Sequence, residues 1–258
     1  AEDVTFTVNE DGTVDRVIMV DKPTHIVLSK KKITNSEELP GALLQVVDKD
    51  GNVVEEWIST DKPHETVAKL VVDESYVLRE VRPADGWAYA EDVPFKVSHD
   101  GTVDYVKMED KPTHVVISKQ EITGSKELPG CTLQVIDKNG NVVDEWFSTD
   151  QPHEIKEKLI ADEEYTLREV RPADGWAYAE DIPFKVSHDG TVDQVKMEDK
   201  PTHVVVSKKK ITGKEELPGC HLVIKDKNGN VVDEWTSSTI PHEIVAKLIA
   251  GEAYTLIE

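Results

Sequence analysis

The chain has 258 residues and a formal net charge of −21 at pH 7. A surface this acidic repels nucleic-acid phosphates and anionic lipid headgroups, so the composition argues against nucleic-acid binding and against membrane-surface binding. The sequence contains no run of 18 apolar residues, so we expect no membrane insertion. Two cysteines in a chain of this length exclude a disulfide scaffold.

The sequence repeats itself with a period of 89 residues, as the spacing of Trp57, Trp146 and Trp235 shows. Three other sets keep the same spacing: Lys30, Lys119 and Lys208; Glu80, Glu169 and Glu258; Asp21, Asp110 and Asp199. A unit of this length is long enough to fold as a small domain of its own, unlike the repeat of a solenoid.

The phase of the repeat predicts four segments. Residues 1–22 read as the closing β-hairpin of an incomplete repeat, and residues 23–111 and 112–200 as two complete repeats. Residues 201–258 read as a third repeat that lacks its last strands. The joints are short and contain proline, as in Asp110-Lys-Pro112-Thr113, so we expect the repeats to form an elongated, semi-rigid rod.

Each complete repeat reads as an all-β, immunoglobulin-like sandwich. In the second complete repeat the expected strands are 113–119, 131–135, 142–148, 155–160, 165–169, 184–186 and 195–199. We expect the last two of these strands to pair across the turn at His188-Asp-Gly190. Short strands separated by turns about every 8–12 residues favour a β-sandwich, and no segment has sustained helical periodicity.

Strand alternation places one lysine, one glutamate and one aspartate of each repeat on apolar faces. Residues two apart on a strand share a face. By this rule Lys30 lies on the same face as Ile26 and Leu28. Glu80 lies on the same face as Tyr76 and Leu78. Asp110 lies on the same face as Val106 and Met108. The second complete repeat has the same pattern at Lys119, Glu169 and Asp199. Charges on apolar faces are rarely left without a partner.

Two interpretations of these residues remain open. They could form buried ion pairs or lie at strand ends in solvent. Alternatively, burial favours a neutral lysine amine and a neutral carboxylic acid. A neutral amine is a nucleophile, a protonated aspartate can lose water, and a glutamate can move the proton between them. The product would be an amide between the lysine and aspartate side chains.

The order and spacing of several motifs resemble the B-type repeats of collagen adhesins and pilin shafts of Gram-positive bacteria (Cna B-type, SpaA-like, prealbumin-like). The motifs are Leu28-Ser-Lys30, Glu38-Leu-Pro-Gly41, Asp50-Gly-Asn52, Tyr76-Val-Leu-Arg-Glu80, Asp85-Gly-Trp87 and Met108-Glu-Asp110. The resemblance implies isopeptide bonds between a first-strand lysine and a last-strand aspartate, assisted by a glutamate. The implied triads are Lys30–Glu80–Asp110 and Lys119–Glu169–Asp199.

Three residues of these sets have no complete triad in the sequence. Lys208 and Glu258 have no counterpart of Asp110, and Asp21 has no counterpart of Lys30. Two explanations stay open. The sequence could be a window cut from a longer array, or residues 1–21 of one copy could complete residues 201–258 of another by strand addition and an inter-chain bond.

The function expected from this pattern is that of a structural stalk in a surface adhesin or pilus-like protein, extracellular and anchored to the Gram-positive cell wall. Its expected partners are neighbouring repeats and, through head-to-tail assembly, other copies of the chain; the sequence does not identify a host ligand. The alternative is a module that binds host matrix or glycans through the loops of Trp87 and Trp176. Bond formation occurs once, so we do not expect an enzyme with turnover.

No metal or cofactor is expected. Asp48-Lys-Asp50-Gly-Asn52 lacks the full ligand spacing of a calcium loop and reads as a hairpin turn. No histidine has a second ligand at metal spacing. Cys131 and Cys220 replace Ala42 at one repeat position, and we expect both to be small buried residues.

Overall fold

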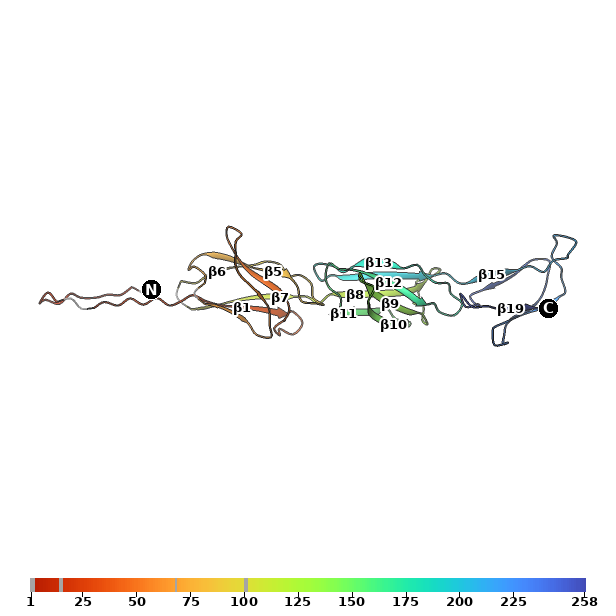
Figure 1. Ribbon diagram of the computed structural model, residues 1–258, viewed down its shortest axis with the longest axis horizontal. Coiled ribbons are helices and arrows are strands. Elements are labelled where there is room, and N and C mark those ends of the chain that lie inside the picture. The colour runs from red at the N-terminus through yellow and green to blue at the C-terminus, as the bar shows by residue number, and fades with distance from the viewer. Residues whose placement is uncertain (1–2, 14–15, 68, 100–101) are drawn as a thin grey trace. The chain divides into compact units, whose positions relative to one another are not determined.

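The computed structural model describes residues 3–13, 16–67, 69–99 and 102–258 (Figure 1). These residues form 19 β-strands and no helix, which confirms the all-β prediction. The strands fall into three groups that follow the repeat, β1–β7, β8–β14 and β15–β19. The two complete groups have the same strand order, as expected for near-identical sequences.

The strand bounds follow the alternation of apolar and polar residues. The first complete repeat contains β1 (His25–Lys32), β2 (Leu43–Asp48), β3 (Val53–Ile58), β4 (His64–Val67), β5 (Ser75–Arg82), β6 (Val93–Lys96) and β7 (Val103–Asp110). The second contains β8 (His114–Glu121), β9 (Thr132–Asp137), β10 (Val142–Phe147), β11 (His153–Lys156), β12 (Glu164–Arg171), β13 (Ile182–Lys185) and β14 (Val192–Asp199). The third group contains β15 (His203–Val206), β16 (His221–Lys225), β17 (Val231–Thr236), β18 (His242–Val245) and β19 (Thr255–Ile257).

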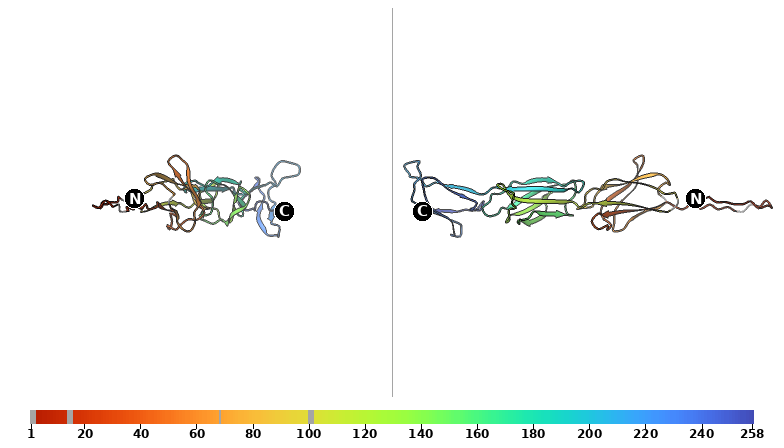
Figure 2. Two further views of the ribbon diagram at one scale, coloured as in Figure 1. Left: turned by 60° about the vertical axis from the view of Figure 1, so that its left-hand side comes forward. Right: turned by 180° about the vertical axis from the view of Figure 1, so that it is seen from behind.

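Each complete repeat is built from two sheets (Figures 1 and 2). In the first, one sheet has the order β4-β1-β7 and the other the order β3-β2-β5-β6. The first and last strands, β1 and β7, are neighbours and run parallel. Antiparallel neighbours can be joined by a tight turn, whereas a parallel pair needs a long connection. Here the connection is the rest of the domain.

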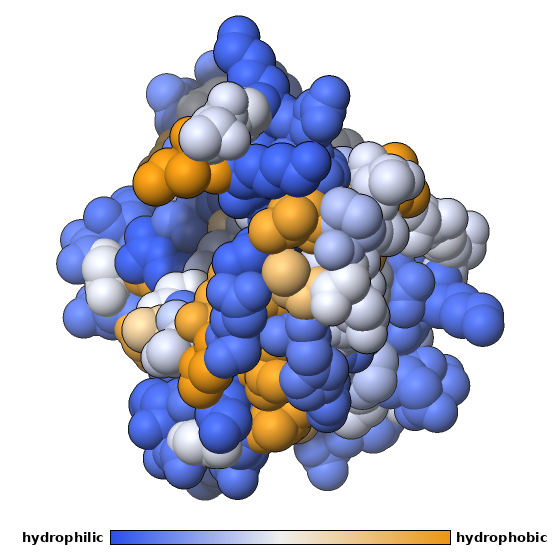
Figure 3. All heavy atoms as spheres, turned by 90° about the vertical axis from the view of Figure 1, so that its right-hand side faces the viewer, coloured by the Kyte–Doolittle hydropathy of each residue, from blue (hydrophilic) through white to orange (hydrophobic). Residues whose placement is uncertain are grey.

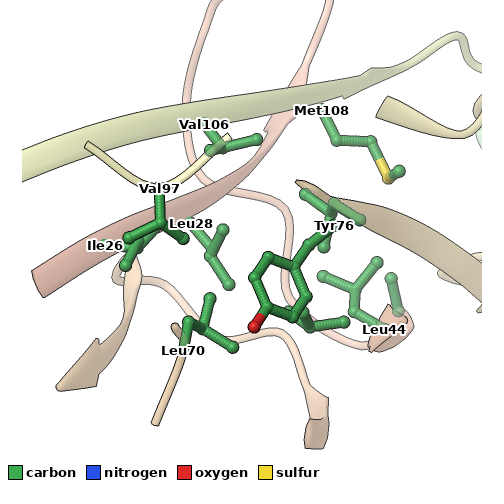
Figure 4. Close-up of a cluster of buried hydrophobic side chains, with 11 residues drawn as sticks. Ile26, Leu28, Leu44, Leu70, Tyr76, Val97, Val106 and Met108 are labelled. Carbon is green, nitrogen blue, oxygen red and sulfur yellow. The ribbon is translucent and has the colours of Figure 1, made fainter. Parts of the chain in front are cut away.

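The apolar faces of the two sheets form the core. Ile26, Leu28, Leu44, Leu78 and Met108 are each at most 2 % exposed and belong to one cluster (Figure 4). They come from β1, β2, β5 and β7, so both sheets contribute. This core brings the inner faces of β1, β5 and β7 together, and these are the strands that carry the predicted site residues.

Two predicted features of the second complete repeat are wrong. The strand predicted at 155–160 ends at Lys156, because Glu157 has a left-handed backbone with φ of 53°. The last two strands do not form a hairpin: β13 pairs with β12, whereas β14 lies beside β8 in the other sheet. A local Asp-Gly turn signal does not distinguish a hairpin from a connection that crosses between sheets.

The two flanking segments differ from the complete repeats. In residues 3–13 and 16–22 the structure has a turn, in which the Gly12 amide donates to the Asn9 carbonyl at 3.1 Å, and no strand. The hairpin predicted over residues 1–22 falls partly on residues 1–2 and 14–15, which lie outside the described residues. In the third group, β15 pairs only with β18 among the described strands, and Val204 and Val205 are 40 % and 54 % exposed.

Apolar surface also appears in the space-filling view. In Figure 3 apolar residues lie between hydrophilic ones on the face that is drawn. Exposed apolar side chains of residues 201–258 include Ile211 and Ile240. Single exposed apolar residues are normal on protein surfaces and indicate no site by themselves.

The core of a complete repeat can be tested by truncating one buried leucine. Leu78 is fully buried in β5, so Leu78→Ala should lower the free energy of unfolding by about 2–5 kcal/mol, through lost apolar contact and a residual cavity. Urea denaturation measures the change. Val53→Ala in β3 is the control, because Val53 is 51 % exposed and its truncation should cost under about 0.5 kcal/mol. Equal losses in the two variants would contradict the assigned core.

Candidate functional site

The parallel pairing of β1 and β7 brings Lys30 and Asp110 to one face of one sheet. In the register, Lys30 lies opposite Met108, and Asp110 lies two residues farther along β7. Residues two apart share a face, so Asp110 points to the same side as Met108, which is buried in the core. The lysine and aspartate therefore reach each other at the inner surface of the sheet.

Glu80 approaches the same point from the opposite sheet, on β5. The Nζ atom of Lys30 lies 2.7 Å from Oε1 of Glu80 and in direct contact with Oδ1 of Asp110. The side chains of the three residues are at most 1 % exposed. The backbone amide of Ala90 donates a hydrogen bond of 2.8 Å to Oε2 of Glu80, which fixes the carboxylate. We call Lys30, Glu80 and Asp110 the buried triad.

The second complete repeat has the same arrangement. Nζ of Lys119 lies 2.8 Å from Oε1 of Glu169 and contacts Oδ1 of Asp199. All three side chains are at most 2 % exposed, and the Ala179 amide donates to Oε2 of Glu169 at 2.8 Å. The structure thus brings together the six residues that the sequence pattern groups into two triads. Whether the amine and the acid join covalently stays a prediction.

Burial changes the acidity of the aspartates. Removal from water raises the pKa of Asp110 to about 7, with a contribution from the nearby Glu80 and opposed by Lys30. Desolvation likewise raises the pKa of Asp199 to about 6, opposed by Lys119 and assisted by Glu169. A raised pKa makes the neutral acid accessible near neutral pH. The neutral acid is the form that an amine can attack with loss of water.

The two triads differ at one neighbouring position. Cys131 is fully buried, and its Sγ lies 3.8 Å from Oδ2 of Asp199. The first complete repeat has Ala42 there, and Oδ2 of Asp110 has no hydrogen-bond partner among the described residues. From the sequence, Cys131 is expected only to be a small buried residue. Strand alternation is the signal that could have placed Cys131 beside the triad. Cys131 lies two residues before Leu133 and therefore faces the same side, and Leu133 lies opposite Glu169 where β9 pairs with β12.

The remaining predicted site residues do not form a triad. Nζ of Lys208 lies 2.5 Å from Oε2 of Glu258, and these side chains are 28 % and 55 % exposed. Asp21 is exposed. The Lys208–Glu258 pair thus repeats one contact of the buried triad in a solvated setting.

The residues around the second triad do not fit a metal ion. Ligand-type atoms of Cys131, Glu169 and Asp199 lie within 4.8 Å of one another. Nζ of Lys119 contacts both carboxyl groups of this set, so the lysine side chain already fills the space between their oxygens. A metal ion at this point would have to displace it.

Two other candidates from the sequence, Asp48 and Trp87, have structural roles, whereas Trp176 is half-buried. The carboxylate of Asp48 accepts hydrogen bonds from the amides of Asp50 and Asn52, at 2.9 and 2.8 Å, so it closes the hairpin turn. Trp87 is 4 % exposed and packs with Leu39 and Ala84. A tryptophan buried to this extent offers little ring surface for stacking on a sugar.

Comparison with known proteins identifies the family of these domains. The family described as SpaA, a prealbumin-like fold domain, matches residues 24–112 and again residues 113–201. A search of curated protein sequences found no match. No helix among the described residues is long and apolar enough to cross a membrane.

Several solved structures resemble this chain at low identity. The Bacillus anthracis TIE protein is 16 % identical with a TM-score of 0.45, and the match covers 92 % of this chain and 48 % of that one. This chain thus spans about half the length of that relative. The shaft pilin SpaA of Lactobacillus rhamnosus GG is 11 % identical with a TM-score of 0.34, over 72 % of this chain and 99 % of the pilin. A streptococcal ancillary pilin is 16 % identical with a TM-score of 0.35, over 74 % and 68 %.

The raised aspartate pKa values predict a pH dependence in a chain whose carboxyls stay unreacted, such as the Lys30→Ala/Lys119→Ala variant, which lacks the two amines that oppose the rise in pKa. Between about pH 4 and 7 the folded state would hold protons that the unfolded carboxyls, with an ordinary pKa of 3.8, have released. The free energy of unfolding should therefore fall as the pH rises through this window. Urea denaturation at pH 5 and pH 8 measures the change.

The matched control adds Asp110→Asn and Asp199→Asn to the same variant, which removes the two titrating groups. Its stability should fall less between pH 5 and pH 8, because only the other carboxyls remain to titrate. An identical pH dependence in the two variants would show that neither aspartate has a raised pKa.

Proposed function

Because the chain belongs to the family of SpaA prealbumin-like fold domains, we propose that its repeats form the structural stalk or spacer of a bacterial surface adhesin or pilus-like protein. Each complete repeat closes itself with an isopeptide bond between its buried lysine and aspartate. The observation that carries this proposal is the contact of a fully buried amine with one carboxyl group, beside a second carboxyl group 2.7 Å away. The location at the cell surface is part of the proposal.

The reaction balances without an oxidant or a cofactor. The lone pair of neutral Lys30 Nζ attacks Cγ of protonated Asp110, and a tetrahedral intermediate forms. Glu80 takes a proton from the nitrogen and delivers one to the departing hydroxyl group. A C–N bond forms, a C–O bond breaks, and one water molecule leaves. The fixed position of Glu80 against the Ala90 amide keeps its other oxygen directed at the amine.

The fold favours amide formation in two ways. Holding the amine against the acid replaces a bimolecular encounter with a unimolecular reaction, which can contribute about 7–11 kcal/mol to lowering the barrier. Two charges without water around them are costly, whereas an amide is neutral. The reaction therefore removes the electrostatic cost of the ion pair that burial creates.

The position of the bond suits a domain under tension. β1 and β7 are the first and last strands, and they run parallel, so a pull on the two ends of a repeat shears one against the other. Lys30 and Asp110 lie 80 positions apart in the sequence. A covalent link between them carries the force directly from β1 to β7, and the intervening residues bear none of it.

The same link restricts the unfolded chain. By analogy with a disulfide that closes a loop of this length, the entropic stabilisation is about 4 kcal/mol. Unlike a disulfide, an amide is not broken by thiols. A spacer outside the cell benefits from both properties, because proteases and force act on opened states.

Intact-mass spectrometry tests the bonds. The chain should be lighter than its sequence mass by two water molecules, one for each buried triad. Lys119→Ala should restore one water, and Lys30→Ala together with Lys119→Ala should restore both, because each removes one nucleophile. Glu80→Gln should also restore one water, because a glutamine side chain cannot take up the proton from the amine.

Lys31→Ala is the matched control, since Lys31 neighbours Lys30 on β1 but has a partly exposed side chain paired with Glu38. This variant should keep the full deficit. A wild-type mass equal to the sequence mass would contradict the covalent part of the proposal and leave the family assignment intact.

Single-molecule stretching tests the load path. With handle proteins fused at both ends, the wild-type chain should show no extension step of a complete repeat. Lys119→Ala should add one step, because the residues between Lys119 and Asp199 then become free to extend. Steps of full repeat length in the wild type would show that force passes through the folded strands.

A further inference from the structure

A buried thiol lies beside the reacting carboxyl group of only one complete repeat. Cys131 is fully buried, and its Sγ contacts Oδ2 of Asp199 at 3.8 Å. In the first complete repeat the corresponding oxygen is Oδ2 of Asp110, which is buried without a hydrogen-bond partner among the described residues. The position of Cys131 is occupied there by Ala42, which is also buried. The two complete repeats thus hold the same triad and differ in one neighbouring polar group, the thiol of Cys131.

The geometry distinguishes the two oxygens of Asp199. Nζ of Lys119 contacts Oδ1, and Oε1 of Glu169 lies 2.8 Å from the same nitrogen. The hydroxyl group that leaves must receive a proton from Glu169, so Oδ1, on the side of the amine, is the oxygen that departs as water. Oδ2 stays and becomes the carbonyl oxygen of the amide. During the attack this oxygen gathers the negative charge of the tetrahedral intermediate.

We propose that Cys131 is a further catalytic residue of the second complete repeat, whose thiol donates a hydrogen bond to Oδ2 of Asp199 as that oxygen becomes negative. The inference rests on the proposed isopeptide reaction. Preorganised donors at an oxygen that gains charge lower the barrier, and they act strongly where water is excluded. The thiol is a weak donor, so its effect is smaller than that of a backbone amide.

The chemical state of Cys131 fits a donor. Desolvation raises the pKa of its thiol to about 11, so the sulfur keeps its proton at neutral pH. A thiolate would be needed for a nucleophile or a metal ligand, and burial disfavours it. Cys220, at the corresponding position of the third repeat, is half-buried and not buried as expected from the sequence. It lies near the carboxylate of Glu258 and helps to lower its pKa, and Glu258 is the counterpart of Glu169.

The test measures how fast the second bond forms. The full chain carries Lys30→Ala, so that any loss of water comes from the second complete repeat. It is synthesised in a short cell-free pulse, and samples are quenched in acidic denaturant over time and weighed by intact-mass spectrometry. Cys131→Ala, which copies the residue of the first repeat, should slow the loss of water roughly 3- to 10-fold.

Cys131→Ser separates catalysis from packing. A hydroxyl group donates a stronger hydrogen bond than a thiol but fills less space, so this variant should react at least as fast as the wild type. Melting temperatures of unlinked Lys119→Ala versions of the Cys131 variants report any loss of packing separately.

The outcomes discriminate between the two proposals. Slow reaction in Cys131→Ala with recovery in Cys131→Ser supports the inference. Equal rates in all three chains, or equal slowing in the alanine and serine variants, overturns it and leaves the isopeptide bond in place. If no chain loses water, including the Cys131 parent, the isopeptide reaction itself fails, and the inference fails with it.

Discussion

Each complete repeat is organised around a lysine amine that is enclosed between two carboxyl groups in an apolar core. Burial excludes bulk water from this point, so the charges must neutralise one another by pairing, by proton transfer or by reaction. The side chains of Lys30, Glu80 and Asp110 are at most 1 % exposed, and the pKa of Asp110 rises to about 7. A raised pKa makes the neutral acid accessible near neutral pH.

This arrangement depends on a particular order of strands. β1 and β7 must be parallel neighbours for Lys30 and Asp110 to share a face, and β5 must lie across the core to present Glu80. A prealbumin-like sandwich provides both, because its first and last strands meet in one sheet. The first and last strands of a repeat are then the strands that carry the lysine and the aspartate of the buried triad.

Much of the site follows from the sequence, because strand alternation has a period of two. The phase of Lys30 with Ile26 and Leu28 predicts an inward side chain, and the structure agrees. The pairing of β14 could not be predicted in the same way, since turn residues report the local bend and not the sheet that the next strand joins. Alternation indicates that Cys131 faces inward, but its contact with Asp199 could not be predicted, because it joins residues 68 positions apart across the core, from the start of β9 in one sheet to the end of β14 in the other.

Tandem mass spectrometry of a protease digest tests the central claim most directly, because it reads the bond itself. The account predicts a branched peptide in which the Lys30 and Asp110 segments are joined with loss of one water, and a second that joins the Lys119 and Asp199 segments. Recovery of these four segments only as separate linear peptides at full mass would contradict it, and would reduce each buried triad to a non-covalent ion pair.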